Sequence, residues 1–287
     1  MVRKLSFIFY KLLFYIDKLF KILTKRSFLI WFKDFIDNDF YKKKKILNND
    51  VYFFAPNQLI TWRVDTLFST EPETIEWIDS FEKKDDLIFW DIGANIGLYS
   101  IYNSIKNKSS STIAFEPSTS NLRVLSRNIS INKLENLIKI FPIPLTNKEN
   151  KFLLMKEGEF MEGAALNTFG ETFNFEGKEF KEKMNYKVIG TKINYLIDNK
   201  ILEIPDYIKI DVDGIEHLIL EGANKHLKNK KIKSLSIEIN ENFTDQFHNV
   251  LKTMEENQFK ILKKKQNKNL LFKGSKFSNT FNYIFVR

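Results

Sequence analysis

The sequence of 287 residues contains no cysteine and three histidines. Without cysteine the chain can form no disulfide bridge, cysteine-based zinc site or catalytic thiol, which is compatible with a reducing, cytoplasmic environment. The three histidines, His217, His226 and His248, do not have a zinc-ligand spacing such as H-x-x-x-H. We therefore expect no metal site.

The chain also lacks a long hydrophobic run. Residues 1–33 are rich in aromatic and aliphatic side chains, but none of their uncharged stretches is longer than LSFIFY. A helix that crosses a bilayer needs about 20 apolar residues. The interspersed lysines also interrupt the apolar core that a signal peptide requires. The sequence therefore predicts neither a transmembrane helix nor a signal peptide.

The first 33 residues contribute strongly to the net charge of +9. Their lysines at a spacing of seven lie along one side of a helix, joined by Lys21; these are Lys4, Lys11, Lys18 and Lys25. Such a basic amphipathic helix can lie on an anionic membrane surface, or its apolar face can pack on the catalytic domain or a second subunit. No RNP-like motif, helix-turn-helix pattern or dense arginine patch accompanies the lysines, so we expect no specific nucleic-acid partner.

One segment combines a strand with a glycine-containing turn. Residues 87–101, LIFWDIGANIGLYSI, read as an apolar strand ending in Asp91, a turn through Gly93, Asn95 and Gly97, and then a helix. Such a turn brings unpaired backbone N–H groups to the carboxyl edge of a sheet, where a ligand can approach the main chain. Glycine, and after it asparagine, best tolerate the left-handed conformation of such turns.

The turn does not fit a dinucleotide. A pyrophosphate site has the pattern G-x-G-x-x-G, whereas the order here is G-A-N-I-G, with Asp91 two positions before the first glycine. A carboxylate at that place repels phosphate and suits a cationic ligand. An NAD-dependent oxidoreductase is therefore disfavoured.

A second carboxylate follows on the next predicted strand. STIAF, residues 111–115, is followed by Glu116 and the helix breaker Pro117. In nucleotide-binding α/β folds a carboxylate at this place accepts hydrogen bonds from both ribose hydroxyls. The two features together predict a nucleoside without a pyrophosphate, and S-adenosylmethionine fits. The alternative is that Asp91 caps a helix and Glu116 is solvated on a loop.

Four motifs in this order resemble those of a known family. WDIGANIGLYS, AFEPSTSNLRVLSRNISIN, YIKIDVDGIEHLILEGA and IEIN are similar to the FkbM family of S-adenosylmethionine-dependent methyltransferases, over residues 60–240. EPETIEWIDSF, residues 71–81, resembles the lead-in that many members carry. The resemblance implies that the turn holds the methionine end of the cofactor and Glu116 its ribose. The expected cofactor-binding residues are Asp91, Gly93, Asn95, Gly97, Glu116 and Asn121.

Apolar stretches of strand length alternate with helical patterns along the chain. Strands are predicted at residues 87–91, 112–116, 137–142, 206–211, 233–239, 258–262 and 281–286, and helices at 72–81, 96–106, 118–131, 215–228 and 244–257. This alternation implies βαβ units and a mostly parallel sheet covered on both faces. We expect an α/β, Rossmann-like class I methyltransferase fold with seven strands, and the resemblance adds a terminal antiparallel hairpin.

The expected organisation is an N-terminal basic amphipathic helical segment, residues 1–50, followed by a methyltransferase domain, residues 51–287. Residues 51–68 read as mixed β-structure and loop, and the lysine run at 42–45 reads as a connection. The glycine-rich insertion at 147–190 predicts hairpins or a lid over the site. The alternative is an exposed β-insertion without a catalytic role.

The candidate catalytic residues follow the fourth strand. YIKIDVDGIEH places Asp211 at the strand end, Lys209 two residues back on the same face, and His217 at the start of the next helix. Methyl transfer to a hydroxyl needs a group that positions the acceptor oxygen and accepts its proton. Asp211 is the preferred base and His217 the alternative. Asp213 and Glu238 face the same rim, but carboxylates alone are a weak indication of magnesium.

These observations predict an S-adenosylmethionine-dependent methyltransferase. The expected reaction is O-methylation of a sugar hydroxyl on a glycan, glycolipid or related metabolite, so the expected partner is a small-molecule or glycan acceptor. The rival is a non-catalytic nucleoside-binding or membrane-associated assembly protein that retains the fold. We expect the protein in the cytoplasm, with peripheral contact to the inner face of the membrane through residues 1–33 as an alternative to domain packing. The sequence leaves the oligomeric state open.

Overall fold

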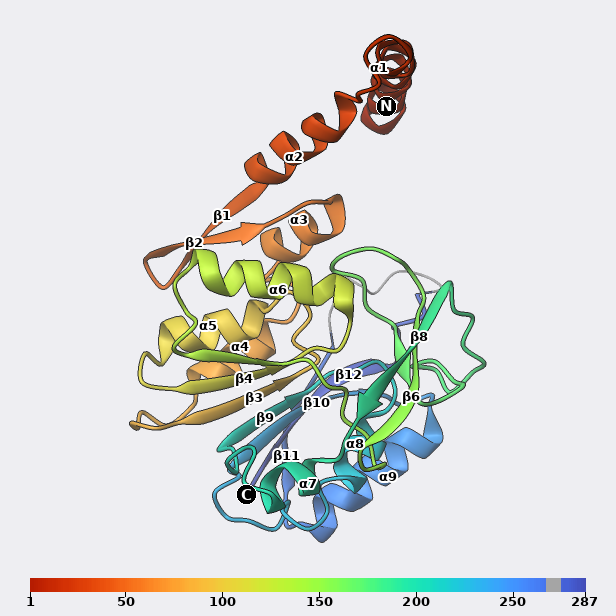
Figure 1. The fold of residues 1–287 in the computed structure, drawn as a ribbon. Coiled ribbons are helices and arrows are strands. Elements are labelled where there is room, and N and C mark those ends of the chain that lie inside the picture. The colour runs from red at the N-terminus through yellow and green to blue at the C-terminus, as the bar shows by residue number, and fades with distance from the viewer. Residues whose placement is uncertain (267–274) are drawn as a thin grey trace.

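Seven strands form the central sheet, in the order β11-β12-β10-β9-β3-β4-β5 (Figure 1). The computed structural model describes residues 1–266 and 275–287. The strands of this sheet are β3 (Ile88–Ile92), β4 (Ser111–Phe115), β5 (Ile138–Phe141), β9 (Tyr207–Ile210), β10 (Ser234–Asn240), β11 (Lys260–Lys265) and β12 (Thr280–Val286). β3, β4, β5, β9 and β10 pair in parallel, whereas β12 is antiparallel to β10 and β11. The expected seven-stranded sheet with its terminal antiparallel hairpin is confirmed.

The inner strands are apolar on both faces because both faces of the sheet are covered. On β3, Phe89 belongs to one buried cluster and Trp90 to the other. The helices over the Phe89 face are α3 (Gln58–Asp65), α4 (Pro72–Asp79), α5 (Leu98–Lys106) and α6 (Thr119–Ile131). Those over the Trp90 face are α7 (Ile193–Asp198), α8 (Glu216–Glu221) and α9 (Thr244–Glu256). The carboxyl ends of the parallel strands therefore meet at one edge between two helical layers.

Residues 51–68 are predicted as mixed β-structure and loop. This prediction is correct for residues 51–54, which belong to a strand, but it is wrong for residues 58–65, which form helix α3. Asn57 caps the helix, because its side-chain oxygen accepts a hydrogen bond from the backbone N–H of Ile60 at 3.0 Å. Ile60 and Val64, one helical turn apart, are both fully buried. Capping and this apolar pair outweigh the β-favouring composition of the segment.

The insertion forms a small antiparallel sheet of its own, in the order β7-β6-β8. Its strands are β6 (Lys151–Glu157), β7 (Thr168–Phe169) and β8 (Met184–Gly190). Met155 and Phe169 join the buried cluster on the Trp90 face of the main sheet. The connection between β6 and β7 is thereby held close to the carboxyl edge of the main sheet.

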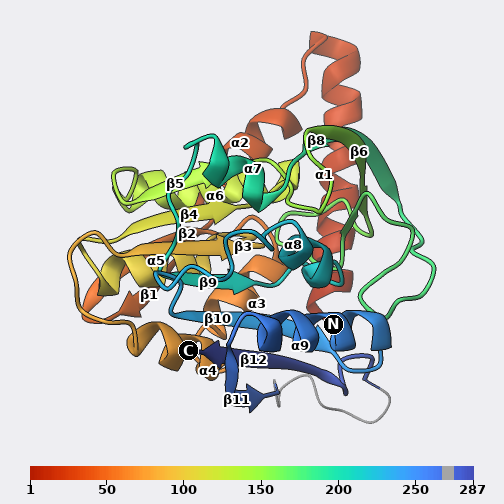
Figure 2. The same cartoon turned by 90° about the horizontal axis from the view of Figure 1, so that it is seen from below.

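The N-terminal region begins with two helices, α1 (Val2–Thr24) and α2 (Leu29–Asp39), instead of one continuous helix. Lys25 ends α1 in the left-handed conformation, with φ of 60°. A hairpin of β1 (Tyr41–Ile46) and β2 (Asn49–Phe54) follows, so the lysine run belongs to a strand and the hairpin crosses the boundary expected at residue 50. Both views show α1 extending beyond the layers that cover the sheet (Figure 1 and Figure 2).

Candidate active site

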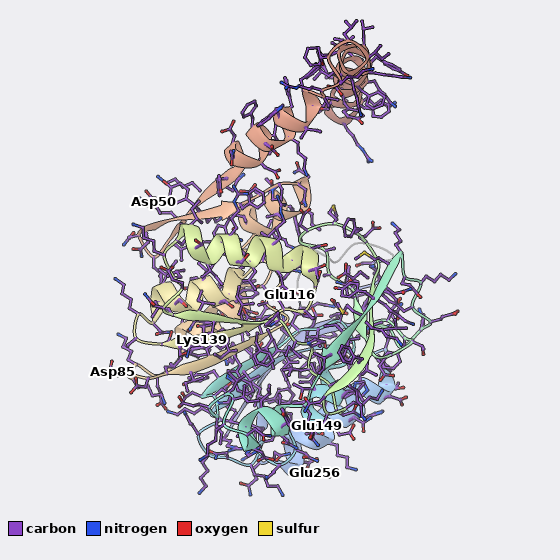
Figure 3. The ribbon with its side chains drawn as sticks, viewed as in Figure 1. Asp50, Asp85, Glu116, Lys139, Glu149 and Glu256 are labelled. Carbon is purple, nitrogen blue, oxygen red and sulfur yellow. The ribbon has the colours of Figure 1, made fainter. Side chains whose placement is uncertain are left out.

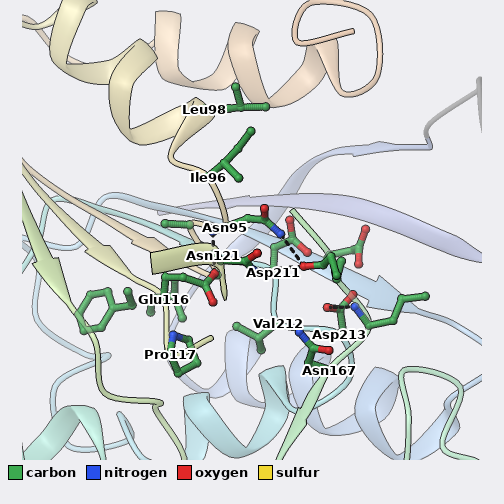
Figure 4. A pocket seen from close by; sticks show the side chains of 18 of the residues that line it. Asn95, Ile96, Leu98, Glu116, Pro117, Asn121, Asn167, Asp211, Val212 and Asp213 are labelled. Atoms are coloured by element: carbon green, nitrogen blue, oxygen red, sulfur yellow. Dashed lines mark hydrogen bonds between the residues drawn. The ribbon is translucent and has the colours of Figure 1, made fainter. Parts of the chain in front are cut away.

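A cavity of about 450 Å³ opens at the carboxyl ends of β3, β4 and β9. Its wall is built by the turn after β3, the end of β4, the segment after β9 and the loop between β6 and β7. Figure 4 shows Glu116 on one side of this cavity and Asp211 and Asp213 on the other. Open parallel sheets bind ligands at this place.

The backbone N–H groups of the turn after β3 form hydrogen bonds within the protein. The backbone N–H groups of Gly93 and Ala94 donate to the carbonyl oxygen of Phe115 at 3.0 and 2.9 Å, and that of Asn95 donates to Glu116. The expectation that these N–H groups are unpaired is therefore wrong. The two loops interlock, and this fixes the end of β3 against the end of β4.

Glycine is required at position 93 for a reason that the sequence does not show. Gly93 has φ of 84°, and a Cβ atom there would lie 1.8 Å from the carbonyl oxygen of Asp211. The constraint is thus the close approach of two loops from neighbouring strands, β3 and β9. Gly93 lines the cavity and sets the distance between its two sides.

Gly97 and Asp91 lie outside the set of residues that line the cavity. A Cβ atom at Gly97 would be 2.5 Å from Leu125 Cδ1, so this glycine lets α5 pack against α6. Asp91 is fully buried, and the hydroxyl of Ser100 donates to its Oδ2 at 2.6 Å. Burial raises the pKa of Asp91, and the charge of Lys209 opposes that rise. Asp91 thus contacts a side chain in the first turn of α5, but it does not cap that helix, which follows Gly97 and has no side-chain cap.

Glu116 is 5% exposed, which excludes a solvated loop position. Its Oε2 accepts a hydrogen bond from the N–H of Asn95 and its Oε1 one from the N–H of Ser118, both at 2.8 Å. Burial raises the pKa of Glu116 to about 7, against the lowering effect of these hydrogen bonds. Each carboxylate oxygen keeps a lone pair that can accept from a further donor. Figure 3 places this side chain near the centre of the molecule, where the strands end.

Asn121 holds the insertion over the cavity. Its Oδ1 accepts a hydrogen bond from the N–H of Gly163 at 2.8 Å, and its Nδ2 donates to the carbonyl oxygen of Ala164 at 3.1 Å. Asn95 Nδ2 donates to the same carbonyl at 3.0 Å. Two predicted cofactor-binding residues therefore also anchor residues 161–167, which we call the roof loop.

Other side chains pin the roof loop from elements far apart in the sequence. Arg63 Nε donates to the carbonyl oxygen of Gly163 at 2.8 Å, and Asn57 Nδ2 donates to that of Glu162 at 2.9 Å. The N–H of Leu166 donates to Asp213 Oδ2 at 2.6 Å. The sequence does not predict these anchors, because no local pattern connects α3 to the insertion.

Lys209 and Asp211 form an ion pair at the other side of the cavity, with 2.7 Å between Nζ and Oδ2. Burial by itself lowers the pKa of Lys209, but the negative charges of Asp211, Asp91 and Glu71 outweigh it and raise the pKa. Lys209 therefore stays charged at neutral pH and cannot accept a proton. It holds Asp211, whose side chain remains partly exposed to the cavity.

Further carboxylates gather around this ion pair. One oxygen each of Asp211, Asp213 and Glu238 lies within 4.8 Å of the others. Burial and the charges of Asp211 and Asp213 raise the pKa of Glu238 well above its usual value. Within residues 1–266 and 275–287, the Glu238 carboxylate makes no hydrogen bond. Acidic groups alone do not establish a metal site, so the expectation of none stays a prediction.

Glu71 is a cavity residue that the sequence reasoning missed. It precedes α4, and its Oε2 accepts a hydrogen bond from the hydroxyl of Tyr99 at 2.9 Å. Both residues line the cavity, and Lys209 Nζ lies 5.2 Å from the centre of the Tyr99 ring. A signal for Glu71 was present, because this residue opens the lead-in motif EPETIEWIDSF.

His217 is not brought to the cavity. Its ring lies between Phe173 and Phe243, with 6.4 and 5.8 Å between ring centres, on α8 and outside the lining residues. Burial lowers its pKa. The preceding Glu216 accepts hydrogen bonds from the N–H groups of Val212 and Gly214, both at 3.0 Å, and so fixes the turn after β9. The geometry gives no support to His217 as a base.

Residues 91–261 match the family described as the Methyltransferase FkbM domain, which is more than half of the chain. The chain belongs to the FkbM methyltransferase family. S-adenosylmethionine is therefore its cofactor, as expected from the sequence. The cavity fits this group: Glu116 offers acceptor oxygens suited to a ribose diol, and the buried Oδ1 of Asn95 makes no hydrogen bond within the described chain.

Known proteins with a similar sequence or fold include methyltransferases. Methyltransferase sdnD of Sordaria araneosa is 29% identical over 154 residues, which are 47% of this chain and 60% of that protein. A Methanococcus jannaschii fibrillarin pre-rRNA processing protein is 13% identical with a TM-score of 0.46, covering 86% of this chain and 82% of the other. A Geobacter metallireducens precorrin-6y C5,15-methyltransferase is 13% identical with a TM-score of 0.43, covering 76% of this chain and 86% of the other. At these TM-scores the two structures support no conclusion about this chain.

Proposed function

We propose that the protein is an S-adenosylmethionine-dependent O-methyltransferase that acts on a sugar hydroxyl of a glycan, glycolipid or related metabolite. The observation that carries this proposal is the position of the Lys209–Asp211 ion pair in the same cavity as Glu116. A carboxylate that is fixed in place but still reachable from the cavity can bind an acceptor hydroxyl and take its proton.

The bound cofactor supplies a methyl group on a sulfonium centre. In this proposal Asp211 orients the acceptor O–H, and its carboxylate takes the proton as the oxygen is methylated. Lys209 is a positioning residue, because its ammonium group fixes Asp211 at 2.7 Å and stays charged throughout. The roof loop, tied down by Asn121 and Arg63, limits the access of water to this place.

The acidic lining supports a neutral or cationic acceptor with several hydroxyl groups. Glu71, Asp211, Asp213 and Glu238 all line the cavity. Of the two cations in the lining, Lys209 is paired with Asp211 and Arg63 donates to the roof-loop carbonyl of Gly163. Carboxylates accept hydrogen bonds from hydroxyl donors, and they repel phosphate or carboxylate groups on an acceptor. A sugar without an anionic substituent satisfies both conditions.

The test is methyl transfer from radiolabelled S-adenosylmethionine to a panel of acceptors. The panel pairs neutral sugars and amino sugars with their phosphorylated or uronic acid counterparts, and transfer is measured together with release of S-adenosylhomocysteine. We expect transfer to neutral or amino sugars and little to the anionic ones. Preferred methylation of anionic or non-sugar acceptors would reject the sugar assignment, and tight cofactor binding without transfer to any acceptor would favour the non-catalytic rival.

A further inference from the structure

Helix α1 carries a broad apolar face that no residue in 1–266 or 275–287 covers. These side chains recur at helical spacing and are between 48% and 75% exposed; they are Leu5, Ile8, Phe9, Leu12, Tyr15, Ile16, Leu19, Ile22 and Leu23. We call this set the α1 apolar face. Figure 3 shows the side chains of α1 reaching into open space around the helix. In the described part of the chain these side chains stay exposed, so the structure does not show the packing on the catalytic domain that was one expectation from the sequence.

The same helix presents positive charge and hides its negative charge. Residues 1–33 contain one acidic residue, Asp17, and eight basic residues, namely Arg3, Lys4, Lys11, Lys18, Lys21, Lys25, Arg26 and Lys33. Asp17 is 8% exposed and accepts hydrogen bonds from the Ser27 hydroxyl at 2.8 Å and the Phe28 N–H at 2.7 Å. The carboxylate thus closes the turn between α1 and α2. The charged groups that remain on the outer surface of residues 1–33 are therefore all cationic.

We propose that the α1 apolar face lies in the interface of a bilayer that contains anionic lipid. A soluble protein partner or a second copy of this chain would cover the apolar face but would not account for the flanking lysines. An anionic membrane surface matches both features. Lys11 Nζ lies 5.4 and 5.6 Å from the ring centres of Phe7 and Phe14, so its charge sits beside aromatic rings on the flank of the helix. Long lysine side chains can extend from there to the lipid headgroups.

The helix lies on the bilayer rather than across it. In residues 1–266 and 275–287, no helix has both the length and the apolar character needed to span a membrane. With about 1.5 Å of rise per residue, the 23 residues of α1 would instead run parallel to the surface. Such helices bind reversibly, and their affinity rises with the anionic lipid content.

Helix α2 connects this membrane-binding helix to the roof loop. Arg123, on α6, donates from Nη2 to Asp37 of α2 at 2.7 Å and from Nη1 to Glu162 of the roof loop at 2.8 Å. Arg127 Nη2 donates to the carbonyl oxygen of Asp37 at 3.2 Å. The bound domain would therefore have a defined orientation to the surface.

The test is co-sedimentation of the full chain with vesicles of phosphatidylcholine alone or with phosphatidylglycerol. We expect binding to the anionic vesicles, and a partition coefficient lower by about tenfold or more for the double variant Leu12→Glu and Leu19→Glu. The double variant Lys11→Gln and Lys18→Gln should lose most of its preference for anionic vesicles. The matched control, Lys228→Gln with Lys230→Gln, removes the same charge from exposed positions on the domain and should bind as the parent does.

Circular dichroism and thermal melting of each variant show whether the fold is kept, so that loss of binding reports on the α1 apolar face. Equal sedimentation of the parent and the Leu12→Glu, Leu19→Glu variant would overturn the proposal. So would absence of vesicle binding with a dimer in light scattering that this variant dissociates, because a second copy would then be the occupant.

Discussion

The two sides of the cavity each carry a buried carboxylate, and only one of the two has hydrogen-bond partners within the protein. On one side Glu116 accepts hydrogen bonds from the backbone of Asn95 and Ser118. On the other side Glu238 makes no hydrogen bond within the described chain, and it lies close to the charged Asp211. Both carboxylates are buried enough to raise their pKa. Glu116 is therefore held in place before any ligand arrives, whereas Glu238 needs a ligand with a hydrogen-bond donor to gain a partner.

The largest expected effect is a loss of turnover when Asp211 is replaced, while cofactor binding on the Glu116 side is kept. The substitution Asp211→Asn keeps the size of the side chain but removes the proton acceptor, so turnover should fall by about 10²- to 10⁴-fold. Affinity for S-adenosylhomocysteine, measured by isothermal titration, should change little because Glu116 is untouched. The substitution His217→Asn is the matched control and should leave turnover nearly unchanged. Near-normal turnover of Asp211→Asn would overturn its assignment as the base.

Gly93→Ala tests whether the loops after β3 and β9, which form the two sides of the cavity, pack directly against each other. The new Cβ would lie 1.8 Å from the carbonyl oxygen of Asp211, at a residue with φ of 84°, so the loops must separate. We expect a loss of unfolding free energy of about 2–4 kcal/mol, measured by urea denaturation. Gly158→Ala, where the nearest atoms are 3.7 Å away, is the control. Equal stability of both variants would contradict the close approach of the loops.

The pH dependence of cofactor binding tests the role of the Glu116 carboxylate. In the proposed site the ionised Glu116 carboxylate would accept hydrogen bonds from both ribose hydroxyls, and burial raises its pKa to about 7. Affinity should therefore fall as the pH drops through 7, by roughly tenfold between pH 8 and pH 6. Asp213 and Glu216, with pKa values raised by burial to about 6 and about 7, titrate in the same range. The variant Glu116→Gln removes the dependence only if Glu116 causes it.

The smallest effect is expected at the surface contact of the roof loop. Arg123→Ala removes two ion pairs from a side chain that is 43% exposed, so the unfolding free energy should change by less than about 1 kcal/mol. Asn121→Ala, which leaves buried backbone groups of the same loop without partners, should cost about 1–3 kcal/mol. Thermal denaturation of the two variants measures the difference. A larger loss for Arg123→Ala would contradict this ranking.

The strands and the carboxylates at their ends could be predicted because their signals are local. A buried strand, a turn residue and a strand-end carboxylate are adjacent in sequence, as in the segments ending in Asp91, Glu116 and Asp211. Each predicted strand boundary lies within a few residues of the observed one. The sheet order then brings these ends to one edge.

The roof loop could not be predicted, because side chains from distant segments hold it in place. The roof loop is held by Asn57, Arg63 and Asn121, and no pattern in the sequence links these residues to position 163. The sequence did not show the packing constraints on Gly93 and Gly97, because Asp211 and Leu125, which a Cβ atom would meet there, lie far away in sequence. The break between α1 and α2 depends on the capping contacts of Asp17, which lies ten residues before Ser27.

The most direct test of the account is isothermal titration of S-adenosylmethionine and S-adenosylhomocysteine into the full chain. We expect micromolar binding of both ligands, lowered about 100-fold in Glu116→Ala because two hydrogen bonds to a charged acceptor are lost. The exposed Glu135→Ala is the control and should bind normally. Absence of binding to the folded parent protein, or equal binding by Glu116→Ala, would contradict the assignment of the cofactor site.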